Sequence, residues 1–189
     1  CDISVAEMVG AYTAFARKGV RRYPLYVTRI EDSNGDVVAE FTPRVREVIS
    51  EDAACKMVTL MRGVIDSGTG HRMRARYHLT VPMAGKTGTT NDNSDGWFVG
   101  YTPSLSFGGW VGGEERDIHF ASMAIGQGAN AALPISAYFL MKVFADKSLG
   151  YSQEEDFDIP EGFDPCGQTD ESETEEEIAV EPVLDNLAN

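Results

Sequence analysis

The sequence predicts an α+β fold in which helices flank an antiparallel sheet. Three short strands, at about 83–90, 96–101 and 104–112, follow one another with short links, which is the spacing of an antiparallel meander. Before and after them, apolar residues recur at helical spacing next to capping signals. The chain has 189 residues, 42% of them hydrophobic, which is enough for one ordinary domain with its own core.

The N-terminal part is predicted to be a helix followed by a β-hairpin. Ser4 and Glu7 have the spacing of a capping box, and Gly19 ends the helix. Residues 24–31 and 37–41 are predicted to be strands, because the Asn-Gly pair between them tolerates positive φ in a tight turn.

Two further helices are predicted from their caps. Ser50 begins one that ends near residue 66, with a buried face of Ala54, Met57, Val58, Met61, Val64 and Ile65. Pro134 suits the first turn of a last helix, which ends near residue 147. Its apolar side contains Ile135, Phe139, Leu140, Val143 and Phe144. A further strand is expected near 118–125.

The formal net charge of −14 lies in the C-terminal tail. Residues 1–150 hold 16 acidic and 16 basic side chains, whereas residues 151–189 hold 14 acidic side chains and no Lys or Arg. We therefore expect a folded domain over 1–150 and an acidic, disordered tail over 151–189, tethered near Phe157 and Phe163. Nucleic acid is excluded as a partner, because no basic patch stands out against phosphate.

Three cysteines, at positions 1, 55 and 166, are too far apart for a disulfide framework or a metal cluster, and Cys55 is expected to be a buried thiol. No stretch approaches 18 apolar residues, so no transmembrane helix is predicted. Because the chain opens at Cys1, with neither an initiating Met nor a signal peptide, we expect it to be a piece of a longer protein.

The stretch GKTGT, residues 85–89, falls on the first strand of the predicted meander. It ends like a phosphate-binding P-loop, but Thr80 stands where the first glycine of that motif belongs. A turn and an aromatic strand follow it, where a P-loop needs a helix. The stretch therefore does not predict a phosphate site.

An acyl-transfer site explains the same stretch better. Lys86 can place a positive charge beside a nucleophilic hydroxyl. Thr87 and Thr89 share one face of the strand and can hold a substrate carboxylate, while Gly88 leaves room for a ligand that lies alongside as an added strand. The backbone N–H of Thr89 can serve an oxyanion.

Lys-Thr-Gly is also one of three motifs of the penicillin-binding proteins and serine β-lactamases. The likeness extends to an ordered series, GKTGTTND, GWFVGYTP and GGWVG, preceded by SVAEMVGAYTAFARKGVRRYPLYVTRIED and MRGVIDSGTG and followed by GQGANAALPISAYFLMKVFADKSLGY. Over residues 1 to about 151, the sequence resembles the transpeptidase domain of bifunctional (class A) penicillin-binding proteins, with a Bacteroides-like closing helix.

The resemblance implies a penicillin-binding/serine β-lactamase-like fold and a peptidoglycan D,D-transpeptidase that works through a serine acyl-enzyme. It assigns Lys86 and Thr89 to catalysis and Thr87, Gly88 and Thr89 to binding of stem peptides and β-lactams. It implies no metal and no organic cofactor. It also implies a longer parent with a glycosyltransferase domain and a membrane anchor, at the periplasmic face of the cytoplasmic membrane.

The sequence departs from the family pattern at two motifs. It contains no S-x-x-K, and neither S-x-N nor Y-x-N, all of which the family carries upstream of the matched region. We therefore expect an N-terminally truncated fold that is inactive alone. We also expect self-association through an open sheet edge. A non-catalytic remnant that binds peptidoglycan or a partner is the alternative, and a serine β-lactamase is a weaker one.

Four other groups admit a functional and a structural interpretation, and the structural one is favoured for each. A sugar platform competes with core packing for Trp97, Phe98, Tyr101, Phe107 and Trp110. Metal ligation competes with surface positions for His71, His78 and His119. Arg72, Arg74 and Arg76 alternate, so they could share a strand face that binds anionic polymer or the acidic tail, or they could form a solvated face. A carboxylate pair competes with turn chemistry for Asp92 and Asp95.

Overall fold

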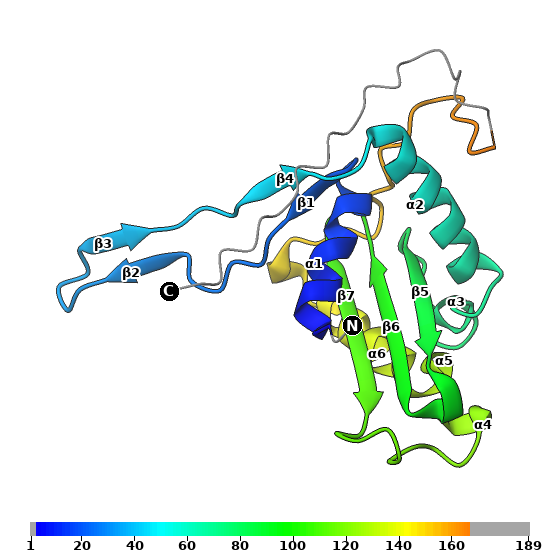
Figure 1. Cartoon of the computed structure of the whole chain (residues 1–189). Coiled ribbons are helices and arrows are strands. Elements are labelled where there is room, and N and C mark those ends of the chain that lie inside the picture. The colour runs from blue at the N-terminus through cyan, green and yellow to red at the C-terminus, as the bar shows by residue number, and fades with distance from the viewer. Residues whose placement is uncertain (1–2, 167–189) are drawn as a thin grey trace, which may run out of the picture.

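The computed structural model describes residues 3–166 and has a sheet between two layers of helices (Figure 1). The sheet has the strand order β5 (Ala84–Thr89), β6 (Asp95–Tyr101) and β7 (Ser106–Gly112), and both pairings are antiparallel. The predicted α+β class and the antiparallel meander are therefore confirmed. Helices α1 (Val5–Ala16) and α2 (Glu51–Asp66) cover one face, and α5 (Gly128–Ala131) and α6 (Leu133–Ala145) cover the other.

The register of the sheet decides which side chains meet which helices. Lys86 lies opposite Val99, and Trp97 lies opposite Trp110, so these side chains share the face of α1 and α2. Phe98 lies on the other face, where it is fully buried against α6. Strand alternation therefore separates an α6-facing core from the surface that carries Lys86.

The caps of α1 and α2 are formed as predicted. The backbone N–H of Glu7 donates to Ser4 Oγ at 3.2 Å, and the Glu7 carboxylate accepts the Ser4 backbone N–H at 2.9 Å. Ser50 Oγ accepts the Ala53 N–H at 3.2 Å. Gly19 has a φ of +94°, and a Cβ there would stand 2.0 Å from the Ile49 carbonyl oxygen, so only glycine fits this turn.

The face of α6 that packs on the sheet differs from the prediction. Leu140 and Val143 are buried as expected, but Ile135 and Phe139 are 51% and 46% exposed. The small side chains of Ser136 and Ala137 are buried in their place. They allow α6 to lie close to β7, where glycines leave room, while Ile135 and Phe139 are turned outward.

The predicted strand at 24–31 is wrong over its first half. Strand β1 (Val20–Arg22) lies earlier and pairs with β4 (Val45–Glu47), whereas β2 (Arg29–Glu31) pairs with β3 (Val37–Glu40) across the predicted turn. Pro24 follows β1 and has no N–H to donate to a ladder, which separates the two short strands. The β2–β3 hairpin projects from the body of the molecule (Figure 1).

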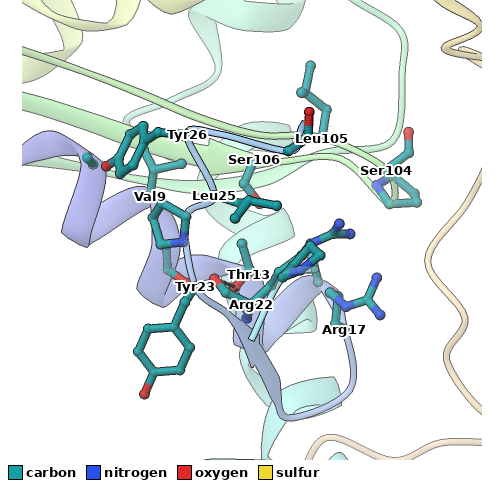
Figure 2. A pocket seen from close by; sticks show the side chains of 17 residues that line it. Val9, Thr13, Arg17, Arg22, Tyr23, Leu25, Tyr26, Ser104, Leu105 and Ser106 are labelled. Carbon is teal, nitrogen blue, oxygen red and sulfur yellow. Dashed lines mark hydrogen bonds between the residues drawn. The ribbon is translucent and has the colours of Figure 1, made fainter. Parts of the chain in front are cut away.

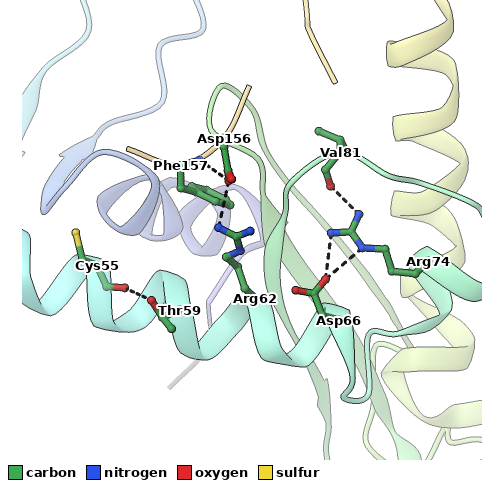
Figure 3. Close-up of polar contacts among 8 residues, drawn as sticks. All are labelled: Cys55, Thr59, Arg62, Asp66, Arg74, Val81, Asp156 and Phe157. Carbon is green, nitrogen blue, oxygen red and sulfur yellow. Dashed lines mark hydrogen bonds and ion pairs between the residues drawn. The ribbon is translucent and has the colours of Figure 1, made fainter. Parts of the chain in front are cut away.

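The expectation that Arg72, Arg74 and Arg76 alternate along a strand is also wrong. Residues Arg72–Ala75 form the short helix α3. The Arg74 guanidinium turns inward and donates to the carbonyl oxygen of Leu79 at 2.7 Å. It also donates to the Val81 carbonyl at 2.7 Å and to the Asp66 carboxylate at 3.2 Å (Figure 3). Arg74 is therefore a structural residue that holds the chain between α3 and β5.

No strand forms at 118–125. Phe120 donates its N–H to the Asn93 carbonyl at 3.3 Å, and helix α4 (Met123–Gly126) follows at once. Single-turn 3-10 helices occur at Asn91–Asn93 (η1) and Lys147–Leu149 (η2). Ile118, Met123 and Ile125 are exposed, so the apolar residues on which this prediction rested do not form the buried face of a strand.

Residues 151–166, named the strap, pass over α2 after η2. Phe157 packs against Tyr101 with ring centroids 5.6 Å apart, and its neighbour Asp156 accepts a bond from Arg62 at 3.1 Å (Figure 3). Asp158 pairs with Lys18 at 2.6 Å. The rest of the expected tail, 167–189, lies outside the described residues. Within the described part, none of the helices has the length and apolar character needed to cross a membrane.

Candidate active site

The GKTGT stretch forms strand β5 at one edge of the sheet. Among the described residues β5 pairs with β6 alone, so its other edge has no strand partner. Thr90 donates its N–H to the Asp95 carbonyl at 3.1 Å, and antiparallel ladders alternate inward and outward N–H groups. The backbone N–H groups of Thr87 and Thr89 consequently point towards the unpaired edge.

A hollow of about 600 Å³ lies between β5 and the N-terminal half of α1. Lys86, Thr87 and Gly88 line it from the sheet, and Met8 and Tyr12 line it from α1. The structure thus brings three of the four predicted site residues to one cleft. The Thr89 side chain is outside the cleft lining.

Lys86 is exposed in this cleft. Its Nζ donates to the Thr87 carbonyl at 2.8 Å, which leaves two of the three ammonium hydrogens available to a ligand. No ion pair involves Lys86 within residues 3–166. Its positive charge is therefore held next to the strand edge without a neutralising carboxylate from the described part of the chain.

Thr87 has a partner that the sequence did not predict. The hydroxyls of Thr87 and Thr69 are 2.7 Å apart and share one hydrogen bond. Thr69 follows α2 in a turn where a Cβ on Gly68 would meet the Val64 Cα at 2.8 Å, so the turn packs closely on the helix. The only signal for Thr69 was its place in the segment MRGVIDSGTG, which by itself gives no role to that hydroxyl.

Thr89 is oriented from the opposite side of the sheet. Its Oγ1 accepts the N–H of Gly128 at 3.0 Å, so the hydroxyl hydrogen is left to donate elsewhere. A Cβ on Gly128 would stand 2.3 Å from the carbonyl oxygens of both Gly88 and Trp97. This glycine therefore allows the start of α5 to reach the end of β5 and fix the hydroxyl.

Packing against Trp97, as well as the predicted space for a ligand, requires a small residue at Gly88. A Cβ at this position would approach the Trp97 Cβ to 3.1 Å. Replacement by a larger residue would push on the Trp97 side chain across the ladder.

The aromatic residues divide between core and cleft. Phe98, Tyr101 and Phe107 are buried, as the structural interpretation predicts. Trp97 and Trp110 instead line the cleft with their ring centroids 6.4 Å apart, and Trp110 remains 38% exposed. They form an apolar wall beside Lys86.

Asp95 holds that wall in place. Its carboxylate accepts the Trp110 Nε1–H at 2.8 Å and the Thr90 hydroxyl at 2.9 Å. The bond from Trp110, followed by those from Thr90 and Ser94, lowers the pKa of Asp95 below its ordinary value. Asp95 therefore acts in this structure as an ionised anchor for Trp110, and does not pair with a second carboxylate.

The remaining candidates belong to turns. Ser94 is buried and its hydroxyl lies 2.9 Å from the Thr90 hydroxyl, and Asp92 has a φ of +58° in η1. Both therefore serve the β5–β6 turn. Within residues 3–166 no three His, Cys, Asp or Glu side chains are grouped so that they could hold a metal ion.

Comparison with known proteins places this geometry in a family context. The family model described as the penicillin binding protein transpeptidase domain matches residues 1–135. The curated penicillin-binding protein 1A from Aquifex aeolicus (strain VF5) is 33% identical over 159 residues, which cover 84% of this chain and 20% of that protein. The chain thus spans about one fifth of the length of this relative.

Solved structures agree in fold. Penicillin-binding protein 1A from Haemophilus influenzae superposes with a TM-score of 0.70 at 20% identity, covering 77% of this chain and 27% of that one. The penicillin-binding protein PonA1 from Mycobacterium tuberculosis superposes with a TM-score of 0.56 at 29% identity, covering 71% of this chain and 36% of that one.

Proposed function

Because the chain belongs to the transpeptidase family of the penicillin-binding proteins, we propose that β5 is one wall of a serine-type D,D-transpeptidase site. One observation carries this proposal: residues 86–89 lie on a sheet edge that has no strand partner within residues 3–166. This edge presents an ammonium group, two hydroxyls and outward-pointing N–H groups. An extended peptide can pair with such an edge as an added strand.

Lys86 supplies the positive charge of this site. Its ammonium group stabilises negative charge that develops on a serine oxygen and on the reacting carbonyl, and it favours the deprotonated nucleophile. The absence of an ion-pair partner within residues 3–166 supports this role, because a salt bridge would neutralise the charge.

Thr87 and Thr89 bind the substrate. Their hydroxyls hold the terminal carboxylate of a stem peptide or the carboxylate of a β-lactam, and the backbone N–H of Thr89 provides one donor to the oxyanion. The bond from Gly128 to Thr89 Oγ1 supports this assignment, because it leaves the hydroxyl hydrogen free to donate. Gly88 keeps the strand open to a peptide that lies along it.

In the complete site, a serine oxygen bonds to the carbonyl carbon of the penultimate D-Ala. The peptide bond to the last D-Ala breaks, and that residue leaves with a proton on its amine. An amine of a neighbouring stem peptide then attacks the ester, and the serine recovers its proton. The parent protein would perform this reaction at the periplasmic face of the cytoplasmic membrane, with an anchor and a glycosyltransferase domain.

The nucleophile is proposed to lie outside this chain. Its sequence has no S-x-x-K, S-x-N or Y-x-N, so the serine and its lysine partner must come from another segment. A catalytic group that acts as a unit loses nearly all activity when its nucleophile is removed. The chain alone is therefore proposed to form no penicillin adduct.

Intact mass after incubation with excess penicillin tests both statements. The chain alone should show no added mass, and the chain expressed in one frame with an upstream S-x-x-K segment should gain one covalent adduct. In that longer protein, K86A should slow adduct formation by about 100-fold or more, as losses of charge-stabilising groups do. K147A, at an exposed lysine in η2, is the matched control and should leave the rate unchanged.

Two results would contradict the proposal. An adduct on the chain alone would show that a nucleophile is present in it. An upstream frame without S-x-x-K, with no adduct from any form, would leave a non-catalytic module that binds peptidoglycan or a partner.

We expect copies of the chain to associate through the outer edge of β7. Within the described residues β7 pairs with β6 alone, so its backbone donors and acceptors lie on an open edge. Open edges pair between chains unless another element covers them. We therefore expect the chain alone to self-associate in sedimentation velocity, and a monomer that melts cooperatively would contradict the truncated-fold interpretation.

A further inference from the structure

A second hollow of about 550 Å³, named the α1 groove, has its own set of lining residues (Figure 2). It is formed by α1, by the segment 22–28 and by the turn before β7, which contribute Val9, Thr13, Arg17, Leu25 and Leu105 among others. The two hollows have no lining residue in common. The α1 groove is therefore a separate candidate site.

The walls of the α1 groove are fixed to one another. Thr13 Oγ1 donates to the Gly10 carbonyl at 2.7 Å and accepts the Arg22 backbone N–H at 2.9 Å. A Cβ on Gly10 would lie 3.3 Å from Pro24 Cδ, so the segment after β1 rests directly on α1. These contacts fix the relative positions of the groove walls.

The chemistry of the groove is aliphatic with a cationic rim. Val9, Leu25 and Leu105 supply apolar surface, while Arg17 and Arg22 supply two exposed guanidinium groups. Neither arginine forms an ion pair with any residue in 3–166. Such a surface suits an extended peptide that carries both acidic and aliphatic residues.

Next to the groove, the strap is held by one apolar contact and one ion pair of the same kind. Its residues 157–159 line a neighbouring hollow, which shares the lining residues Ala16, Arg17 and Pro103 with the α1 groove. There Phe157 packs on Tyr101, and Asp158 pairs with Lys18 at 2.6 Å. The two hollows are therefore neighbours, and an acidic, apolar segment of this chain forms part of the wall of the second one.

We propose that the α1 groove is the docking site for residues 175–187 of the same chain. Their sequence, EEEIAVEPVLDNL, contains five acidic side chains and, apart from one alanine, five aliphatic ones. It contains no Lys or Arg. This composition matches the aliphatic floor and the arginine rim.

The connection is long enough for the segment to reach the groove. Eighteen residues separate Ile159 of the strap from Ile178, and an extended chain spans roughly 3.3–3.6 Å per residue. Tethering gives the segment an effective concentration on the order of millimolar. A contact with a Kd on the order of millimolar would therefore be about half occupied within one molecule.

Carbodiimide cross-linking of the full chain tests the proposal, because this reagent joins an amine to a carboxylate in direct contact. R17K and R22K keep the rim charge and introduce an amine there, and R76K introduces an amine at an exposed position away from the groove. The existing contact of Lys18 with Asp158 should cross-link in every variant, which reports that each is folded.

The expected result is cross-linking of R17K or R22K to carboxylates within 175–187 at least five-fold above R76K. Replacing Ile178, Val180, Val183 and Leu184 by serine should abolish the excess while the Lys18 link persists. A mixture of ¹⁴N and ¹⁵N chains distinguishes the occupants. Mixed-isotope links would overturn the proposal in favour of a second copy, and yields equal to R76K would overturn it altogether.

Discussion

The hydroxyls of Thr69 and Thr87 lie 2.7 Å apart, and this contact joins the turn after α2 to the edge strand of the candidate site. It holds the Thr87 side chain in one orientation at the edge of β5. A threonine that is already positioned loses less freedom when it binds a carboxylate, so Thr69 is expected to support binding through Thr87.

The first prediction concerns this pair. In a longer protein that carries the serine, T69V should slow penicillin acylation by about 2- to 10-fold, because one hydrogen bond is worth about 0.5–1.5 kcal/mol. The measurement is the rate of adduct formation at subsaturating penicillin. T59V is the matched control, because the Thr59 hydroxyl bonds to the Cys55 carbonyl of its own helix at 3.0 Å (Figure 3). Equal rates of adduct formation for T69V and T59V would show that Thr69 does not support binding through Thr87.

The second prediction concerns Arg74. R74M should lower the free energy of unfolding by about 2–4 kcal/mol, because it leaves the Leu79 and Val81 carbonyls without their charged donor. R76M is the control and should cost under about 1 kcal/mol, since Arg76 only lies over the Tyr77 ring at 5.7 Å. Urea unfolding of the chain measures both. Similar losses for the two variants would mean that Arg74 does not hold this segment.

The sequence predicts the helices and the meander well where local signals are strong. Ser4 and Ser50 cap helices in the structure because each hydroxyl accepts the backbone N–H of the residue three positions later, and this spacing is visible in the sequence. The part of the Lys86 cleft that lies on β5 was predicted, because the alternation of side chains along a strand fixes which of them share a face.

Contacts between distant segments could not be predicted in this way. Thr69 meets Thr87 only because α2 and β5 are packed together, and Gly128 meets Thr89 only because α5 crosses the end of the sheet. Arg74 turned out to be structural because carbonyls five and seven residues later curl back towards it. Spacing along the chain carries no information about these approaches.

The third prediction concerns the strap. F157A should lower the free energy of unfolding by about 1–3 kcal/mol, less than a fully buried Phe, because Phe157 is only partly buried against Tyr101. It should also expose residues 151–166 to limited proteolysis. F163A is the control, since no aromatic contact links Phe163 to the body in the described residues. Unchanged cleavage of F157A would show that contacts other than the Phe157 ring, such as the ion pairs of Lys18 and Arg62, hold the strap.

The fourth prediction concerns Tyr101 at alkaline pH. Burial raises the pKa of its phenol above the ordinary value, because the fully buried site disfavours phenolate. A group whose pKa is higher in the folded state contributes stability below its unfolded pKa, about 10 for tyrosine, and loses it as the pH rises further. The free energy of unfolding of the chain, relative to that of Y101F, should therefore fall above pH ~10 by up to about 1.4 kcal/mol per pH unit. Y26F, at a tyrosine that is 82% exposed, should follow the unmodified chain across the same range. A difference between the chain and Y101F that stays constant up to pH ~11.5 would contradict burial of the phenol in its neutral form.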